Sequence, residues 1–294
     1  MKSICSIKEI IVNEIKRIED IRTNGRRITG IPTGFKKIDD LTSGLQRSNL
    51  IVIAARPSMG KMDFALTIAR NAALERVPVA MISLVTSTEF FVRKLFCMEA
   101  KMKIEQIYNG SLSEVNWSIL NKSAQKLSDL PIFTCDTAGC TVTAIREKVR
   151  KIKDVHDVGL IIIEHLQQIR SEGLHSTREQ EVADICRSLK ELAVEFNLAV
   201  IVLSEVSRKP EFRSNHRPRL GDIAEGDAAS YADVVFFVYR DYVYKRSENN
   251  PEKDITEIIV EKNKNGPTGH VKLFYDEEYR SFENFGDRFC LTVG

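Results

Sequence analysis

The fold is decided by one stretch of sequence, Leu50-Ile51-Val52-Ile53-Ala54-Ala55-Arg56-Pro57-Ser58-Met59-Gly60-Lys61-Met62. Its apolar run predicts a buried strand, and residues 63–74 carry apolar side chains at helical spacing. A strand, a tight loop ending in Gly-Lys and a helix form the layout of a phosphate-binding loop, whose backbone amides surround an anion. The general pattern is G-x-x-x-x-G-K followed by Ser or Thr. The predicted nucleotide-binding residues are Ala55, Arg56, Pro57, Ser58, Met59, Gly60, Lys61 and Met62. The alternative is a strand–turn–helix corner with a solvated lysine.

Composition fits a globular α/β protein. Of 294 residues, 43% are hydrophobic and 29% charged, and the net charge is +2, so any nucleic-acid site must be local. No apolar run approaches the roughly 18 residues that cross a bilayer, and residues 1–10 lack the apolar core of a signal peptide. The six cysteines are scattered without a Cys-x-x-Cys pair. This usage favours reduced thiols in a cytoplasmic protein.

Further apolar runs alternate with helical segments along the chain. The expected elements are strands at 79–84, 132–134, 159–164, 199–204 and 234–239, helices at 35–41, 88–100, 143–152 and 178–196, two helices within 102–130 and a hairpin of 257–261 with 271–275. Such alternation predicts a mostly parallel sheet covered by helices on both faces. We expect Trp117 in the core. Ligands of such folds bind at the carboxyl ends of the strands, where Lys61, Glu164 and Glu205 fall.

An amphipathic helix is expected at residues 6–21. Ser6 and Glu9 form a capping-box pattern at its start, and a polar break follows at 23–27. One face carries Ile7, Ile10, Ile11, Ile15 and Ile18. This face requires a partner, which is either the helix's own domain or a neighbouring subunit, and both remain open. The expected division is a linker helix and linker at 1–29 and a globular domain at 30–294.

Several longer segments carry a family resemblance. They are Ile31-Pro32-Thr33-Gly34-Phe35, Leu41-Thr42-Ser43-Gly44-Leu45-Gln46-Arg47, the loop 55–61, Leu203-Ser204 with Ser207-Arg208, Tyr239-Arg240-Asp241, and Asn265-Gly266-Pro267-Thr268-Gly269. Together they resemble the RecA-type motor domain of the DnaB family of replicative DNA helicases. The resemblance implies a RecA-like P-loop NTPase fold, use of ATP and Mg²⁺, and a hexameric ring that moves along single-stranded DNA during replication. It also implies that the first helix docks on the adjacent subunit.

The catalytic positions depart from the family pattern. Met62 stands where the family has a hydroxyl that binds magnesium, and a soft thioether is a poor partner for a hard cation. Asp63 suits the helix dipole but would repel a phosphate placed beside it; the alternative is that it only caps the helix. Val85 stands where the family has its catalytic glutamate. Loss of a general base typically costs about 100- to 10,000-fold in rate.

Two acidic positions keep or change their charge relative to the family. Glu164 replaces the aspartate that holds magnesium, and its extra methylene changes the geometry, so a metal role and its loss are both open. Glu205 replaces a glutamine that contacts the terminal phosphate, and a carboxylate acceptor repels what an amide donor attracts. A second interpretation makes Glu205 the missing base.

Two lysines are candidates for action in the neighbouring subunit's site. Lys262 matches a family lysine that reaches that site, and Lys264 stands in place of the arginine finger. Lysine keeps the charge but loses the planar fork of arginine, and a finger arginine is worth roughly a thousandfold or more. The alternative is that both are solvated lysines near a turn.

The segment that contacts DNA in the family also differs. Here it reads Asp222-Ile223-Ala224-Glu225-Gly226-Asp227, so an arginine is lost and an acid is added. Phosphate contacts supply most non-specific DNA affinity, and we expect weak or absent binding of single-stranded DNA here. Arg208, Glu225 and Gly226 are the candidate DNA-binding residues. A basic cluster contains Arg208, Lys209, Arg213, Arg217 and Arg219 and is either a solvated loop or a DNA contact.

Two functions from different classes fit this pattern. The first is a DnaB-type helicase motor with weak or lost hydrolysis, in which Lys61, Glu164 and Glu205 act in one subunit and Lys262 and Lys264 act from the next. The second is a non-catalytic DnaB-like paralogue that binds to and regulates or loads a helicase ring. Expected partners are further copies of the chain in a ring or a linker-helix-swapped assembly, a DnaB-type helicase, a primase or a loader. No membrane partner is expected. A recombinase or clock-type relative is disfavoured because the segments match DnaB better.

Overall fold

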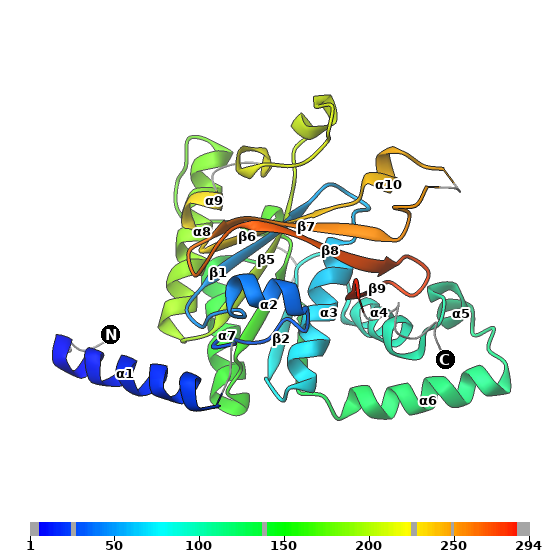
Figure 1. Ribbon diagram of the computed structural model, residues 1–294, viewed down its shortest axis with the longest axis horizontal. Helices are drawn as coiled ribbons and strands as arrows, with labels where there is room; N and C mark the ends of the chain where they lie inside the picture. Colours follow the sequence, from blue (N-terminus) through cyan, green and yellow to red (C-terminus); the bar gives the residue numbers. More distant parts are fainter. Residues whose placement is uncertain (1–5, 25–27, 137–139, 225–227, 248–249, 287–294) are drawn as a thin grey trace.

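A nine-stranded sheet forms the centre of the computed structural model, which describes residues 6–24, 28–136, 140–224, 228–247 and 250–286 (Figure 1). The strand order is β3-β2-β4-β5-β1-β6-β7-β8-β9. The pairs from β3 to β6 are parallel, and β7, β8 and β9 continue the sheet antiparallel. The strands are β1 (Leu50–Ala55), β2 (Val79–Ser83), β3 (Ile132–Asp136), β4 (Leu160–Glu164), β5 (Ala199–Glu205), β6 (Val234–Tyr239), β7 (Ile255–Asn263), β8 (Gly269–Asp276) and β9 (Ser281–Asn284).

Helices cover both faces of the sheet, as the alternation of strands and helices predicts. The longer ones are α1 (Ile7–Asn24), α2 (Lys36–Thr42), α3 (Lys61–Leu74), α4 (Thr88–Ala100), α5 (Ile104–Asn109), α6 (Glu114–Ser128), α7 (Val142–His156) and α8 (Arg178–Glu195). Short ones are α9 (Ala228–Tyr231), α10 (Asp241–Tyr244) and the 3₁₀ turns η1 (Leu166–Gln168), η2 (Lys209–Phe212) and η3 (Leu220–Asp222). Within the described residues, no helix combines the length and apolarity needed to cross a bilayer.

Strand β1 contributes to the core on both faces. Side chains alternate along a strand, so Ile51, Ile53 and Ala55 join the layer under α2, α3 and α4, whereas Val52 and Ala54 join the layer under α7, α8 and α9. All six residues of β1 are buried, and the strand pairs in parallel with β5 on one side and β6 on the other. The continuous apolar run in the sequence therefore reflects burial on two faces.

Helix α1 extends away from the rest of the molecule, at the left of Figure 1. The five isoleucines of its predicted apolar face are exposed, from 50% at Ile11 to 75% at Ile7. Of the two partners that the sequence leaves open for this face, the described part of the helix's own domain does not cover it. A continuous exposed apolar face of this kind is a candidate site of protein–protein contact.

One core prediction was wrong. Trp117, expected to anchor the core, is 54% exposed on α6. The side of α6 that packs inward carries Leu120 and Leu127, which are partly buried, and Trp117 lies off that side. The hairpin prediction was correct, since β7 and β8 pair antiparallel. The edge strand β9 was not predicted, because four residues give too short a pattern.

A buried ion pair joins α3 to α4. Asp63 is 3% exposed and accepts hydrogen bonds from the Lys94 ammonium and, at 2.7 Å, from the Tyr275 hydroxyl of β8. The Asp63 oxygens point to α4 and β8, where Lys94 supplies the opposite charge, so the expected repulsion of a neighbouring phosphate is offset. The alternative that Asp63 caps the helix was wrong, because α3 has no side-chain cap. A buried pair of charges is costly to break from one side.

We predict that Lys94→Met lowers the free energy of unfolding by about 3 kcal/mol, because the Asp63 carboxylate stays buried without its cation. The double variant Asp63→Ala/Lys94→Met should recover most of the loss, since two apolar side chains replace a buried pair at little cost. Urea denaturation measures both. Lys101→Met, which breaks the half-exposed pair with Glu283, is the control and should change stability by less than about 1 kcal/mol. A double variant as unstable as the single one would contradict this account.

Candidate functional site

The loop between β1 and α3 has the geometry of an anion cradle. Gly60 begins α3 with φ 90°, in the left-handed region that favours glycine. A Cβ at Gly60 would come within 3.3 Å of the Phe282 ring, so a side chain there would also press on this ring. Met59 is buried and anchors the loop in the core. The first amides of α3 have no carbonyl acceptor within their helix and are available to phosphate oxygens.

The ammonium of Lys61 lies at the carboxyl edge of the sheet. Its Nζ donates to the Ser204 carbonyl oxygen at 3.2 Å and lies 3.9 Å from Glu205 Oε1. Burial lowers the pKa of Lys61 to about 8, although the charges of Glu205 and Glu164 raise it. The structure thus brings the predicted residues Lys61, Glu164 and Glu205 to one edge of the sheet. A phosphate near Lys61 would add further negative charge and favour the charged ammonium.

Glu164 lies at the end of β4 and is buried. Its Oε2 accepts hydrogen bonds from Ser83 Oγ at 2.8 Å and from the Thr86 hydroxyl. Met62, at the position of the family's hydroxyl ligand, packs against the core layer under α3. Among the described residues, no group of three or more His, Cys, Asp or Glu side chains is arranged to hold a metal ion. These side chains fit magnesium poorly, because the Glu164 carboxylate already accepts hydrogen bonds from two hydroxyls and Met62 offers only a thioether sulfur.

Glu205 faces a histidine that has no predicted role. His165 Nε2 lies 3.6 Å from Glu205 Oε1, and His165 Nδ1 lies 3.2 Å from Gln167 Oε1. Burial, together with the Lys61 ammonium, lowers the pKa of His165. Sequence reasoning missed His165, although it directly follows Glu164 and this adjacency was the available signal. Val85 is 59% exposed in the loop after β2, so the place of the family's glutamate presents an apolar surface.

Lys262 and Lys264 lie far from the loop of their own chain. Lys264 Nζ lies 3.0 Å from Asp233 Oδ1, and Asp233 also accepts from the Leu50 amide at the start of β1. Lys262 Nζ donates to the Ala229 carbonyl at 2.6 Å. Lys61 follows the other end of β1, and a strand of six residues spans about 17 Å. A role for either lysine at a phosphate therefore requires another subunit.

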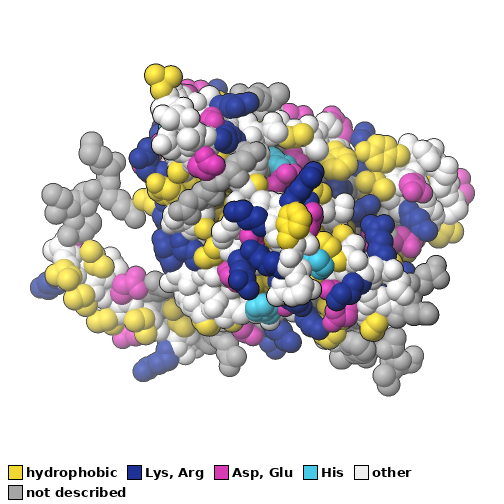
Figure 2. Space-filling view, turned by 90° about the horizontal axis from the view of Figure 1, so that it is seen from above, with side chains coloured by type: hydrophobic (Ala, Val, Ile, Leu, Met, Phe, Trp, Pro, Cys, Tyr) yellow, Lys and Arg dark blue, Asp and Glu magenta, His cyan; other side chains and the backbone are white. Residues whose placement is uncertain are grey.

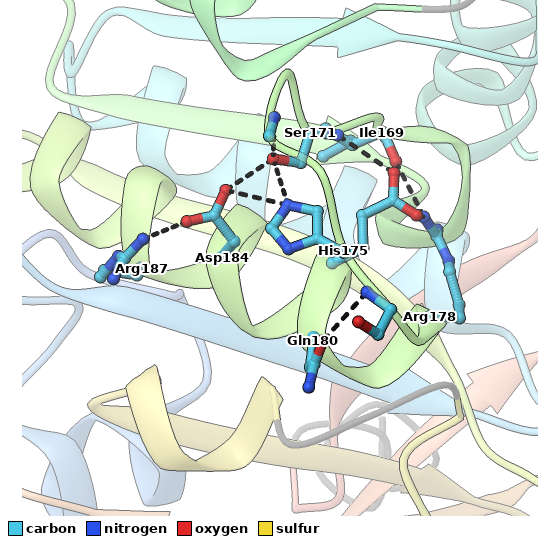
Figure 3. A network of polar contacts seen from close by, with 10 residues as sticks. Ile169, Ser171, His175, Arg178, Gln180, Asp184 and Arg187 are labelled. Carbon is cyan, nitrogen blue, oxygen red and sulfur yellow. Dashed lines mark hydrogen bonds and ion pairs between the residues drawn. The ribbon is translucent and has the colours of Figure 1, made fainter.

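A serine and a histidine of the loop between β4 and α8 contact an aspartate of α8 (Figure 3). Ser171 Oγ donates to Asp184 Oδ2 at 2.5 Å and lies 2.9 Å from His175 Nε2. Asp184 also approaches His175 at Nε2, at 3.6 Å, and pairs with Arg187. A hydrolytic triad needs the acid on one ring nitrogen and the serine on the other. Because both contact the same nitrogen, this network orders the loop and does not build a nucleophile.

A cavity of about 150 Å³ adjoins the loop at Ser58. Its lining includes Arg240, which is 2% exposed, stacks 4.6 Å from the Tyr275 ring centroid and pairs with Glu277 at 2.9 Å. The Nε of Arg240 has no hydrogen-bond partner among the described residues. The segment Tyr239-Arg240-Asp241 carried part of the family resemblance but had no assigned role. In the structure, Arg240 and the residues that follow this segment line the cavity. The other lining residues are Tyr242, Val243 and Arg246.

Only one of the three candidate DNA-binding residues, Arg208, lies within the described residues. Glu225 and Gly226 lie outside the described residues. Arg208 is exposed and precedes η2. The basic cluster is not one set of free charges, because Arg213 pairs with Asp222 at 2.8 Å and Arg217 with Glu257 at 2.8 Å.

A mostly parallel sheet with helices on both faces and a glycine–lysine loop at its carboxyl edge is the architecture of RecA-like α/β domains. Residues 30–284 match the DnaB-like helicase C terminal domain family, and the chain belongs to that family.

The proteins and solved structures to which this chain is similar are replicative DNA helicases and an ATPase domain. The chain is 42% identical to the replicative DNA helicase DnaB of Geobacillus stearothermophilus and 41% identical to the replicative DNA helicase DnaC of Bacillus subtilis (strain 168), in each case over 97% of this chain and 63% of the relative. It thus spans less than two thirds of their length. A solved structure described as an ATPase domain superimposes with TM-score 0.89 at 33% identity, covering 96% of this chain and all of that domain. A DnaB-like replicative helicase, described with its interactions with primase, gives 0.88 at 33% identity, covering 95% and 68%.

We predict that ADP binding, measured without magnesium by isothermal titration calorimetry, weakens as the pH rises above about 8. The phosphates favour the charged ammonium of Lys61, so binding raises its pKa and takes up a proton. Above its free pKa of about 8, Lys61 must first be protonated, and the affinity should fall by up to about tenfold per pH unit. Comparison of buffers with different ionisation enthalpies counts the proton. Lys61→Ala should abolish binding, and unchanged affinity in that variant would rule out the phosphate-loop assignment.

Proposed function

We propose that this chain is a DnaB-type replicative helicase motor domain that binds a nucleotide and assembles with other subunits, but hydrolyses ATP slowly or not at all. The observation that carries the proposal is that the loop before α3 keeps the features of a phosphate-binding loop, whereas the residues at the family's catalytic positions differ. Phosphate binding is supported by the left-handed backbone of Gly60 and by the position of the Lys61 ammonium at the carboxyl edge of the sheet. Met62, Val85 and the hydroxyl-bound Glu164 do not supply the groups that the family uses on magnesium and water.

The nucleotide would lie along the carboxyl edge of the sheet. The loop amides and Lys61 contact its phosphates, and the cavity beside Ser58 lies where the ribose and base leave the loop. Arg240 offers a buried Nε there that has no partner among the described residues, and Tyr242 offers an aromatic ring. ATP is the ligand that the family implies. Glu164 is the residue predicted to contact magnesium. Because the side chains present are poor magnesium ligands, we assign no step of hydrolysis to the metal.

The neighbouring subunit would complete the site. Lys264 and Lys262 lie at the far end of β1 from the loop, and in a ring that end of one subunit is free to face the loop of the next. Lys264 would have to exchange Asp233 for a phosphate, and it is 53% exposed, so its side chain has room to move. As a lysine it offers one point charge without the fork of arginine.

A second candidate is a regulatory or loading subunit for another helicase ring. The exposed isoleucine face of α1 favours it, because this face requires a partner and a domain without hydrolysis still presents it. A primase is a further candidate partner, since a similar DnaB-like replicative helicase is described with its interactions with primase.

We predict that the natural chain hydrolyses ATP at least about 100-fold more slowly than a variant carrying Met62→Thr, Val85→Glu, Glu164→Asp and Glu205→Gln, because the variant regains a hydroxyl ligand and a general base. Phosphate release with magnesium, with and without single-stranded DNA, is the measurement. Both proteins should bind ADP, which controls for folding of the loop. A natural chain with hydrolysis as fast as the variant and stimulated by DNA would overturn the proposed loss and make Glu205 the base to test.

We predict that Ile11→Asp/Ile15→Asp breaks assembly, because two carboxylates on the apolar face of α1 cannot be buried against a neighbour. Light scattering coupled to size-exclusion chromatography reports the mass. Asn13→Asp/Lys16→Gln makes the same change in charge on α1 without removing an isoleucine and should assemble normally. An undiminished oligomer in the isoleucine variant would rule out docking through α1. Mixing with an active helicase separates the two candidates, since only the regulatory subunit should inhibit or remodel it.

A further inference from the structure

An aromatic side chain stands exposed in the loop that contains η2. Phe212 is 88% exposed, although globular domains usually bury such rings. The loop rises above the sheet as the yellow-green segment at the top of Figure 1. Neighbouring residues hold it in place: Pro210 is buried, and Arg56 Nε donates to Glu211 Oε1 at 2.9 Å. Phe212 is therefore presented by a fixed turn.

Two exposed cations lie three and four positions before this ring in the chain. They are Arg208 and Lys209, and within the described part of the chain neither side chain makes an ion pair. The acid next to the ring, Glu211, is neutralised by Arg56. The charge left beside Phe212 is therefore positive. Figure 2 looks onto this upper face and shows lysine and arginine side chains gathered near its middle.

We infer that Phe212, with Arg208 and Lys209, forms a contact for single-stranded DNA in which the ring stacks on a base and the two cations bind flanking phosphates. An aromatic platform beside a positive groove is the general means of binding single strands without sequence preference. An acidic protein segment would use the cations but gain little from an exposed planar ring. Duplex DNA keeps its bases stacked and offers no face to Phe212.

This contact would compensate for the weakened family segment. Ala224 stands where the family has an arginine, and Asp227 adds an acid to the same segment. The loop of η2 joins that segment through Arg213, whose guanidinium binds Asp222. Binding at Phe212 would therefore place the strand beside the family's usual path. The inference takes only the polymer, single-stranded DNA, from the proposed function and does not require nucleotide binding or hydrolysis.

The test is fluorescence anisotropy of a labelled oligothymidine of about 20 nucleotides, without nucleotide, with the full chain. Phe212→Ala should weaken binding by roughly fivefold or more, the lower limit for loss of one stacked base. Phe212→Tyr should bind like the natural chain, because it keeps the ring. Phe212→Leu should behave like the alanine variant, because it keeps the apolar area and loses the stacking face. Phe212 is exposed, so all three variants should fold like the natural chain, and circular dichroism checks this.

The contribution of Arg208 and Lys209 is measured separately, from the salt dependence of the DNA affinity. Arg208→Gln/Lys209→Gln should lower the slope of log affinity against log salt by about 1.4, since each phosphate contact to a single strand contributes about 0.7. Lys36→Gln/Lys37→Gln removes two exposed lysines of α2 and should leave the slope unchanged.

Four results would overturn the inference: full affinity in Phe212→Ala, full affinity in Phe212→Leu, equal affinity for duplex DNA, or a changed oligomeric mass in Phe212→Ala, which would make the ring a subunit contact. Lys61→Ala should bind DNA normally. A natural chain that binds single-stranded DNA but not ADP would count against the proposed function alone, and a natural chain that binds ADP but not single-stranded DNA would count against this contact alone.

Discussion

The burial of β1 on both faces is the constraint on which the rest of the structure depends. Six apolar residues pair with β5 on one side and β6 on the other, so the strand has no freedom to shift. Its carboxyl end therefore fixes the loop that holds Lys61, and the amide of its first residue binds Asp233, which in turn holds Lys264. This one strand therefore sets the positions of Lys61, at the nucleotide site proposed in its own subunit, and of Lys264, proposed to act in the next subunit.

Under the proposed function, a single subunit is incomplete. The groups around Lys61 come from the ends of β4 and β5, whereas the two lysines proposed to act in trans lie at the opposite edge of the sheet. The loop would need a second copy to receive Lys264, and the apolar face of α1 is left exposed by the described part of its own domain. The proposal therefore links assembly to the nucleotide site by geometry, and a loss of hydrolysis would leave the requirement for assembly unchanged.

Much of the fold was predictable because the strands are continuous apolar runs and the helices have clear periodicity. The loop, Glu164 and Glu205 could be placed together from the rule that parallel strands carry ligands at their carboxyl ends. Contacts between residues far apart in the sequence could not be predicted. Asp63 and Lys94 are 31 positions apart, and no local pattern tells a buried pair from two surface charges. Trp117 failed for a related reason, since its burial depends on how α6 is rotated against α4. His165 carries no motif, and only the folded sheet brings its ring to Glu205.

The pair of Asp63 and Lys94 also restricts the history of this domain. Each side chain is acceptable in the core only when the other is present, so a lineage that gained one charge first passed through a less stable intermediate. Such epistasis fixes the order of substitution, because earlier stabilising changes must come before the first charge. It also makes the pair hard to lose, since a return to two apolar residues crosses the same barrier. Asp63 follows Met62 directly, so the start of α3 carries a side chain that cannot easily be replaced without a matching change at Lys94.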